Sequence, residues 1–203
     1  MKKIDYKKEW RHLYQPSAKE VAVVDVPAMN FLMIDGAGNP GTTPFFQEAT
    51  ETLFAVAYQL KFMIKKGEQQ VDYGVMPLEG LWWADDMSQF SVDKKEDWKW
   101  TLMMMQPEYV TAELYAEAVE QVKKKKNPAA LPLMQFETYT EGKSAHIMHI
   151  GPFSEEGPTV AKVHDFIAAN SGELSGKHHE IYLSDIRKAA PEKWKTVVRQ
   201  PFK

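Results

Sequence analysis

Apolar residues in the first part of the chain follow a strand pattern and then a helical one. Residues 20–35 (EVAVVDVPAMNFLMID) predict one or two strands, and the loop GAGNPGTT after them contains glycines that can adopt positive φ. A helix is then expected, with Thr43 as its N-cap and Pro44 at its first position. Gly67 ends this helix, and its apolar stripe consists of Ala49, Leu53, Val56, Leu60 and Ile64.

The middle of the chain predicts extended segments followed by a second helix. Residues 71–83 (VDYGVMPLEGLWW) read as extended chain with a break near Pro77, and residues 98–105 (WKWTLMMM) as another strand. Pro107 is expected to open the helix, and the helix ends at the lysines before Pro128. Its apolar positions recur at helical spacing and are Val110, Leu114, Ala118 and Val122.

The last third of the chain predicts a hairpin, a helix and a strand. The segments FETYTEG and SAHIMHIGPF, within residues 136–153, predict a β-hairpin. Pro158 then starts a helix, and residues 170–172 (NSG) stop it. Its inner face consists of Val160, Val163, His164 and Ile167. Residues 178–183 (HHEIYL) predict a short strand, and the remaining tail is expected to contain one helical turn from Pro191.

The two halves of the chain repeat one order of elements, namely strand, Gly/Pro loop, helix and strand. Such a repeat predicts a single α+β domain over residues 1–203, with one repeat at about 20–126 and the other at about 133–203. We expect a pseudo-twofold arrangement with antiparallel sheet and a central ligand cleft along the symmetry axis. Strand and helix alternation would also fit other α+β arrangements.

Composition and charge narrow the class of protein. The 203 residues are 44% apolar and 26% charged, which is ordinary for a globular domain. A net charge of −3 gives no general attraction to nucleic acid, and the basic run 123–126 closes a predicted helix, where it complements the helix dipole. Without an apolar run of membrane length or a secretory leader, the chain is expected to be cytoplasmic with no membrane partner.

Two glutamates stand out as candidates for chemistry. In a strand, Glu180 and Tyr182 project from one face, because side chains alternate with period two. Glu79 holds the comparable place in the first half, directly before Gly80 and the tryptophans Trp82 and Trp83. A carboxylate beside aromatic faces can bind an organic cation, or can act as a general base if desolvation raises its pKa. The alternative is a strand glutamate in an exposed salt bridge.

Aromatic residues are abundant, with six Trp, eight Tyr and ten Phe. Together with methionines they could form a flat and adaptable apolar pocket. The candidates are Tyr58, Phe62, Trp82, Trp83, Trp98, Trp100 and Met103 to Met105. The alternative for each of them is an ordinary place in the core.

Other kinds of site find little support in the sequence. There is no cysteine, so thiolate nucleophiles, thiolate metal ligands and disulfides are excluded. His146 and His149 lie three apart in a predicted strand and face opposite sides, and His178 with Glu180 gives only two possible ligands, so no metal site is expected. Neither a G-x-S-x-G elbow nor the G-x-G-x-x-G spacing occurs. We expect no cofactor.

The order of several motifs resembles the GyrI-like small-molecule-binding family. These motifs are VMPLEGLWW in the first half, and HIGPF, a helix and HHEIYLSDIRKAAPEKWKTVVRQP in the second. The resemblance spans about residues 20–203. Its most specific feature is the pairing of an I-G-P-[FY] hairpin with a downstream E-I-Y-L strand.

This resemblance implies a fold of two strand-helix-strand repeats of the SHS2 type, with a strand glutamate, here Glu180, at the floor of the cleft between them. Relatives serve as drug-sensing domains attached to DNA-binding modules, as gyrase-inhibitor-like proteins, and as stand-alone hydrolases that open cyclopropane rings. The segment before residue 20 leaves no room for a helix-turn-helix module, so we do not expect a transcription factor.

The resemblance further implies a small-molecule partner, a hydrophobic or cationic polycyclic compound bound in an aromatic cleft. A cofactor-independent hydrolase would use Glu180 and Tyr182 to open strained cyclopropanoid rings with water and so detoxify them. The residues expected to bind the ligand are Glu79, Trp82, Trp83, Tyr58, Trp98 and Phe153. The alternative is a non-catalytic protein that sequesters drugs or resembles the gyrase inhibitors, and the sequence does not choose between the two.

Overall fold

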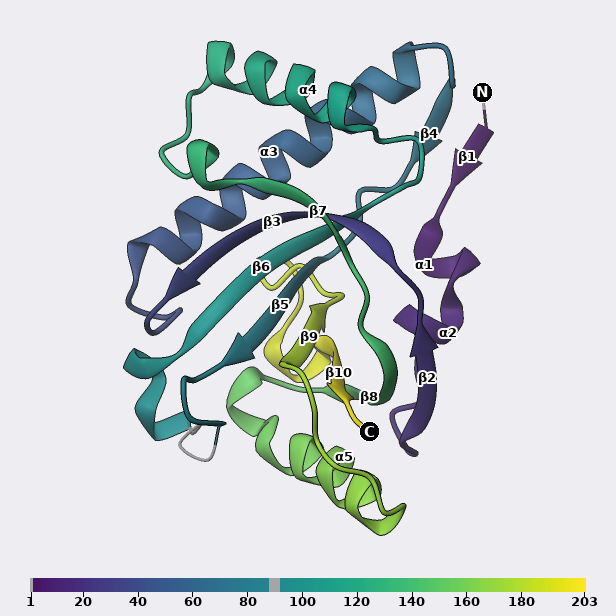
Figure 1. Ribbon diagram of the computed structural model, residues 1–203, viewed down its shortest axis with the longest axis vertical. Coiled ribbons are helices and arrows are strands. Elements are labelled where there is room, and N and C mark those ends of the chain that lie inside the picture. The colour runs from purple at the N-terminus through teal and green to yellow at the C-terminus, as the bar shows by residue number, and fades with distance from the viewer. Residues whose placement is uncertain (1, 88–91) are drawn as a thin grey trace. The chain divides into compact units, whose positions relative to one another are not determined.

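The chain forms two compact units whose segments alternate along the sequence. The computed structural model describes residues 2–87 and 92–203. Unit 1 consists of Met1–Tyr6, Met29–Met76 and Trp82–Tyr139, and unit 2 of Lys7–Ala28, Pro77–Leu81 and Thr140–Lys203. Both units contain helices and antiparallel strands (Figure 1), which confirms the predicted α+β class. The repeat boundaries and the cleft stay predictions.

Unit 1 is built on three antiparallel strands. β3 (Met29–Ala37) lies in the middle, with β6 (Lys99–Gln106) on one side and β7 (Gln135–Tyr139) on the other. The short β1 (Lys2–Ile4) pairs in parallel with β4 (Val71–Tyr73). β6 is buried along nearly its whole length, which agrees with the mostly apolar run WTLMMM in the sequence.

The long helix of unit 1 forms where the apolar periodicity predicts it. α3 (Pro44–Lys66) follows Thr43 as N-cap residue and ends at Gly67. It packs against β3, β6 and the second long helix, α4 (Ala112–Lys125) (Figure 1). Its predicted apolar stripe is buried throughout, at Ala49, Leu53, Val56, Leu60 and Ile64.

The second helix begins later than the sequence predicts. α4 spans Ala112–Lys125, and Pro107 lies before it in a turn where the Val110 N–H donates to the Pro107 carbonyl. Thr111 is the true N-cap, and its hydroxyl accepts from the Leu114 N–H at 3.3 Å. The expectation that Pro107 opens the helix is therefore wrong, because a threonine four residues on offers the cap that the helix start needs.

A close backbone approach explains one glycine of the GAGNPG segment. Gly36 pairs with Trp100 across β3 and β6. A Cβ at Gly36 would lie 2.1 Å from the Trp100 ring, so no larger residue fits there without moving the indole. The fully buried Trp100 is thus packed directly on the main chain of β3.

Unit 2 is built on four antiparallel strands in the order β2-β8-β10-β9. They are β2 (Ala22–Val26), β8 (Gly142–Ile150), β10 (Lys195–Pro201) and β9 (His178–Tyr182). The strand β5 (Leu78–Trp83) begins in unit 2 and is the next neighbour of β9.

The strand β10 corrects the prediction for the last residues. The expected helical turn is present as η5 (Pro191–Lys193), but residues 195–201 continue as a strand between β8 and β9. Its polar side chains Thr196, Arg199 and Gln200 are buried, so the segment lacks the apolar signature of a central strand. Pattern analysis therefore missed this strand, because buried polar residues that hydrogen-bond inside the unit take the place of apolar ones.

The predicted hairpin within residues 136–153 does not form. β7 pairs with β3, whereas β8 pairs with β2 and β10. Both segments are strands, as expected, but their partners come from elsewhere in the chain. Alternation of apolar and polar residues identifies a strand and carries no information on its neighbour.

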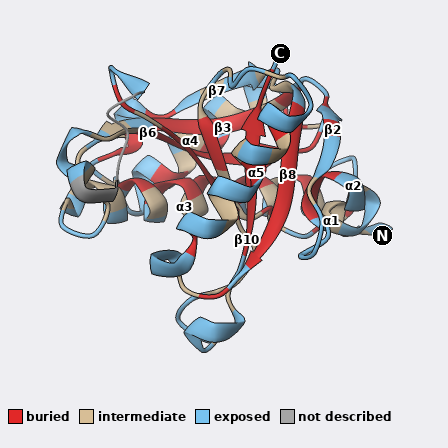
Figure 2. Ribbon diagram, turned by 90° about the horizontal axis from the view of Figure 1, so that it is seen from below, coloured by how far each residue is buried: buried red, intermediate tan, exposed pale blue. Residues whose placement is uncertain are grey.

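The helix of unit 2 covers a compact apolar core. α5 (Gly157–Ala169) packs on β8 and β10, and Figure 2 shows these two strands as buried and α5 with an exposed side. It stops where predicted, with Ser171 at a φ of 57°. The core cluster consists of Ala145, Ile147, Val163, Ile167, Val198 and Phe202.

Short helical elements complete the described chain. They are α1 (Tyr6–Glu9), α2 (Arg11–Tyr14), η2 (Val92–Asp97), η3 (Leu131–Leu133) and η4 (Phe153–Glu155). None of the described helices combines the length and the apolar character needed to cross a bilayer.

Candidate functional site

Glu180 lies on β9 with a polar neighbour on each side of it. Because His178, Glu180 and Tyr182 alternate along the strand, their side chains project from the same face. The Tyr182 hydroxyl donates to Glu180 Oε2 at 2.7 Å, and His178 Nε2 hydrogen-bonds to Glu180 Oε1 at 3.0 Å. The Glu180 side chain is 17% exposed. Both carboxylate oxygens are thus held in place while the group remains reachable from solvent.

Aromatic rings stand next to this carboxylate. The Phe153 ring meets the Tyr182 ring edge to face at 5.6 Å and lies tilted against Trp194 at 5.1 Å. Trp194 is fixed in turn, since its indole N–H donates to the Ala189 carbonyl at 2.9 Å. Phe153 is 40% exposed. An apolar surface of this kind can stack a planar ligand beside the charge of Glu180.

Glu156 brings a second carboxyl group to the same place. It is buried just before α5 and interacts with Glu180 and Thr196. Burial and the nearby Glu180 carboxylate raise the pKa of Glu156 well above its usual range. Burial alone would raise the pKa of Glu180 as well, but the hydrogen bonds from His178 and Tyr182 outweigh it and lower that pKa.

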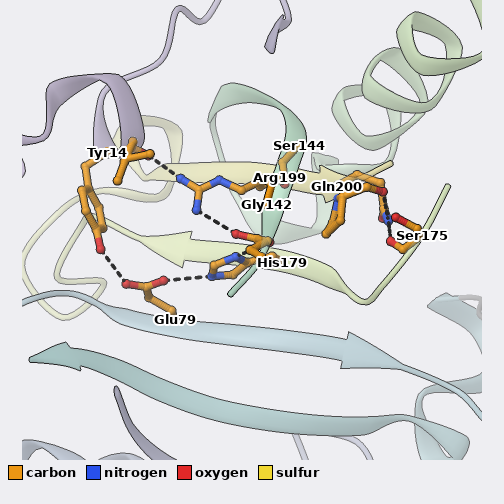
Figure 3. Close-up of polar contacts among 11 residues, drawn as sticks. Tyr14, Glu79, Gly142, Ser144, Ser175, His179, Arg199 and Gln200 are labelled. Atoms are coloured by element: carbon orange, nitrogen blue, oxygen red, sulfur yellow. Dashed lines mark hydrogen bonds and ion pairs between the residues drawn. The ribbon is translucent and has the colours of Figure 1, made fainter. Parts of the chain in front are cut away.

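Glu79 belongs to a buried network of charges instead of an exposed surface (Figure 3). It is 1% exposed, and its carboxylate accepts from the Tyr14 hydroxyl at 3.2 Å and from His179 Nε2 at 2.9 Å. His179 Nδ1 bonds Glu141 at 2.8 Å, and Glu141 accepts from Arg199 at 3.1 Å. Both oxygens of Glu79 are therefore occupied within unit 2.

Charge balance explains why this network is stable when buried. Burial alone would lower the pKa of His179, but the carboxylates of Glu141 and Glu79 outweigh it and raise that pKa to about 9. His179 and Arg199 thus carry two positive charges against the two negative charges of the glutamates. Arg199 also donates to the Leu13 carbonyl at 2.5 Å, which ties α2 to β10.

The predicted tryptophans Trp82 and Trp98 belong to an aromatic cluster in unit 1. Trp82 is buried, stacks on Phe46 at 6.0 Å and meets Trp98 edge to face at 5.6 Å. Trp98 and Trp83 are partly buried. Tyr58 is 47% exposed on α3, where its ring stacks with neighbouring phenylalanines of the same helix.

The structure therefore places the predicted site residues in separate clusters. Glu180, Tyr182 and Phe153 come together in unit 2, while Trp82 and Trp98 contact each other in unit 1. Their roles in binding or catalysis stay predictions. Within residues 2–87 and 92–203, His, Asp and Glu side chains form no group of three that could hold a metal ion.

Sequence analysis missed Glu156 and Trp194 as members of the Glu180 cluster. Each comes from a different element, and spacing along one strand cannot detect such contacts. A usable signal existed for Glu156, which follows the HIGPF motif closely in the sequence and precedes Pro158 at a helix start. Trp194 follows the turn at Pro191 that the sequence did predict.

Comparison with known proteins identifies the family. The model of the GyrI-like small molecule binding domain matches residues 19–203, so the chain belongs to the GyrI-like family, as the motifs suggested. A search of curated proteins found no match.

Solved structures agree with this assignment. A conserved, uncharacterised protein from Listeria innocua is 41% identical, with a TM-score of 0.91 over 98% of this chain and 100% of that one. A hydrolase from Listeria innocua is 40% identical, with a TM-score of 0.88 over 100% of both chains. The C-terminal domain of EcmrR shares the fold alone, at 12% identity and a TM-score of 0.57 over 91% of this chain and 97% of that one.

Proposed function

We propose that this protein binds polycyclic small molecules beside Glu180 and hydrolyses strained cyclopropanoid rings in them, as a detoxifying enzyme without a cofactor. The observation that carries the proposal is the partly exposed Glu180 carboxylate, which Tyr182 and His178 hold in place next to the exposed ring of Phe153. A fixed carboxylate beside an aromatic surface can direct a water molecule at a stacked electrophile.

The proposed ring opening requires only one general base from the site. Water attacks the ring methylene of a cyclopropane conjugated to a dienone, so a C–O bond forms and a ring C–C bond breaks. The electron pair of that bond moves into the dienone, which becomes a phenoxide, while Glu180 takes a proton from the attacking water. Because the strained ring is already activated, base assistance of roughly 10²- to 10⁴-fold would suffice.

Similarity to proteins of the same family supports this proposal. The hydrolase from Listeria innocua matches this chain along its full length at 40% identity. A protein of the same length and fold is thus described as a hydrolase. The cyclopropanoid class of substrate is proposed from the chemistry of the Glu180 site and from the family resemblance.

Mass spectrometry tests the proposal directly. A polycyclic spirocyclopropyl dienone incubated with purified protein is expected to gain the mass of one water molecule. Glu180→Gln and Tyr182→Phe should abolish or strongly slow this conversion while the ligand still binds. Glu173→Gln, an exposed glutamate of the same unit, serves as the matched control and should convert at the wild-type rate. A wild-type protein that leaves the dienone intact would refute the proposal.

A second candidate function is sequestration without catalysis. The hydrogen bonds that lower the pKa of Glu180 make it a weaker base and a more permanent negative charge, which suits binding of an organic cation. This function predicts saturable quenching of tryptophan fluorescence by a polycyclic cation that is recovered unchanged. It also predicts weaker quenching in Glu180→Gln.

A further inference from the structure

Glu156 has no place in the reaction described so far, although it interacts directly with Glu180. It is 7% exposed and occupies the N-cap position of α5. Its carboxyl group interacts with the carboxyl group of Glu180 and with the side chain of Thr196. Thr196 lies on β10, opposite Tyr182 of β9. One of its oxygens, Oε1, is buried without a hydrogen-bond partner in the described part of the chain. Such a group is costly unless it carries a proton.

Contact between two carboxyl groups demands a proton between them. Ionised carboxylates only accept hydrogen bonds, so Glu156 and Glu180 repel each other unless one of them is protonated. Glu180 is the better anion of the two, because His178 and Tyr182 both hydrogen-bond to its oxygens. Glu156 has Thr196 beside it but no comparable pair of donors among the described residues, so it is the member that keeps the proton. The raised pKa of Glu156 and the lowered pKa of Glu180 agree with this distribution.

We propose that Glu156 and Glu180 share a single proton and work as one acid–base unit, in which Glu156 is the positioning residue that stores the proton. This inference rests on the proposed hydrolysis and identifies the group that supplies the proton for its last step. Ring opening leaves a phenoxide that needs a proton, and the attacking water has a proton to lose. The pair gives its stored proton to the phenoxide through Glu180 and takes one from water. It therefore holds one proton before and after each turnover.

The surroundings of Glu156 contain few other groups that could replace it. On β9, His178 and Tyr182 both hydrogen-bond to Glu180, and β10 offers the uncharged Thr196 beside Glu156. The His149 ring of β8 is engaged with the Thr159 hydroxyl and the Pro152 carbonyl. Glu155 precedes Glu156 and is exposed, so its side chain lies at the surface and not among the buried groups.

Carbon-13 NMR of glutamate carboxyl groups tests the shared proton without any ligand. In the wild type, one glutamate signal should titrate well above the ordinary range, and Glu156→Gln should remove it. Glu180→Gln should move that signal back towards ordinary values, since the neighbouring charge is gone. Titration of every glutamate in the ordinary range would overturn the inference.

The pH profile of spirocyclopropyl dienone hydrolysis tests the role of the stored proton. The wild-type rate should fall on the alkaline side, as Glu156 loses its proton. Glu156→Gln should keep the fold and ligand binding, lose about 100-fold in rate, and lose the alkaline fall. Glu155→Gln is the matched control and should keep both the rate and the profile. A merely structural role would change stability and leave the shape of the profile intact.

The outcomes separate this inference from the proposed function. If the wild type converts no dienone, hydrolysis is refuted and the acid–base unit with it, while the NMR titration still decides whether the proton is shared. If the wild type converts the dienone and Glu156→Gln does so at the same rate and with the same profile, only the role of Glu156 is refuted.

Discussion

Glu180 and Glu79 are both strand glutamates of unit 2, yet their electrostatic environments differ in kind. Glu79 is fully buried and faces the protonated His179, so its charge is neutralised inside the protein. Glu180 keeps 17% of its side chain exposed, and its nearest carboxyl neighbour is Glu156. Of these two glutamates, only Glu180 therefore presents a negative charge to which a ligand can bind. The charge of Glu79 is buried and paired with His179, so it cannot attract a ligand from solvent.

The aromatic surface beside Glu180 leads to a prediction about binding. Phe153→Ala removes an exposed ring, so the Kd of a planar polycyclic probe should rise about tenfold, which corresponds to about 1.4 kcal/mol. The measurement is a titration followed by quenching of tryptophan fluorescence. Leu133→Ala is the control, because Leu133 is an exposed apolar residue of unit 1 that belongs to neither candidate set. Equal weakening in both variants would contradict a specific role for Phe153.

Predictability at the residue scale depends on whether partners share one strand. The period of two correctly placed Glu180 and Tyr182 on one face of β9. Glu156 meets them from the start of α5 and Trp194 from the turn before β10, contacts that depend on tertiary packing. For the same reason the sequence could not distinguish the buried Glu79 from Glu180, since its partners Tyr14 and His179 lie far away in the chain.

At the scale of elements, the two longest helices have threonine N-caps of unequal strength. The Thr111 hydroxyl accepts from the Leu114 N–H at the start of α4, whereas the Thr43 side chain makes no such cap at α3. Thr111→Ala should lower the free energy of unfolding by about 1 kcal/mol, and Thr43→Ala by a few tenths. Urea denaturation at neutral pH measures both variants. Equal losses would show that the Thr111 hydrogen bond contributes nothing.

Helices and strands differ in how far the sequence reveals them. The stripe from Ala49 to Ile64 predicts α3 almost to the residue, because a helix repeats one signal over many turns. β10 carries Arg199 and Gln200 in a buried position, and their hydrogen bonds to distant backbone and side chains replace the apolar pattern. Its identity as a strand depends on those partners, which no local pattern contains.

At the scale of the whole molecule, the buried network makes stability depend on pH. The folded-state pKa of His179, about 9, exceeds its unfolded value near 6.5. A raised pKa means that the folded state binds the proton more tightly, so this contribution is full below pH 6.5 and disappears as pH rises towards 9. This contribution of His179 to the unfolding free energy should therefore fall by roughly 2 to 3 kcal/mol over that range.

Urea denaturation between pH 6 and 9 measures this slope. In His179→Gln the titrating group is absent, so the fall should be shallower, although the variant is less stable at every pH because the flanking glutamates lose their counter-charge. Proton NMR of the wild-type imidazole provides a second measurement that needs no variant. A His179 ring that is neutral at pH 7 would contradict the predicted slope.

The interleaving of the two units has a practical consequence for dissection of the gene. Unit 2 draws on three separate stretches of sequence, and two of them, Lys7–Ala28 and Pro77–Leu81, lie between segments of unit 1. No single truncation can therefore yield either unit alone. A shortened chain that starts at Thr140 would lack β2 and the Tyr14, Glu79 and Leu13 partners of the charge network, and would leave His179 and Arg199 incompletely compensated. Isolating unit 2 would require a redesigned chain that splices its three stretches together.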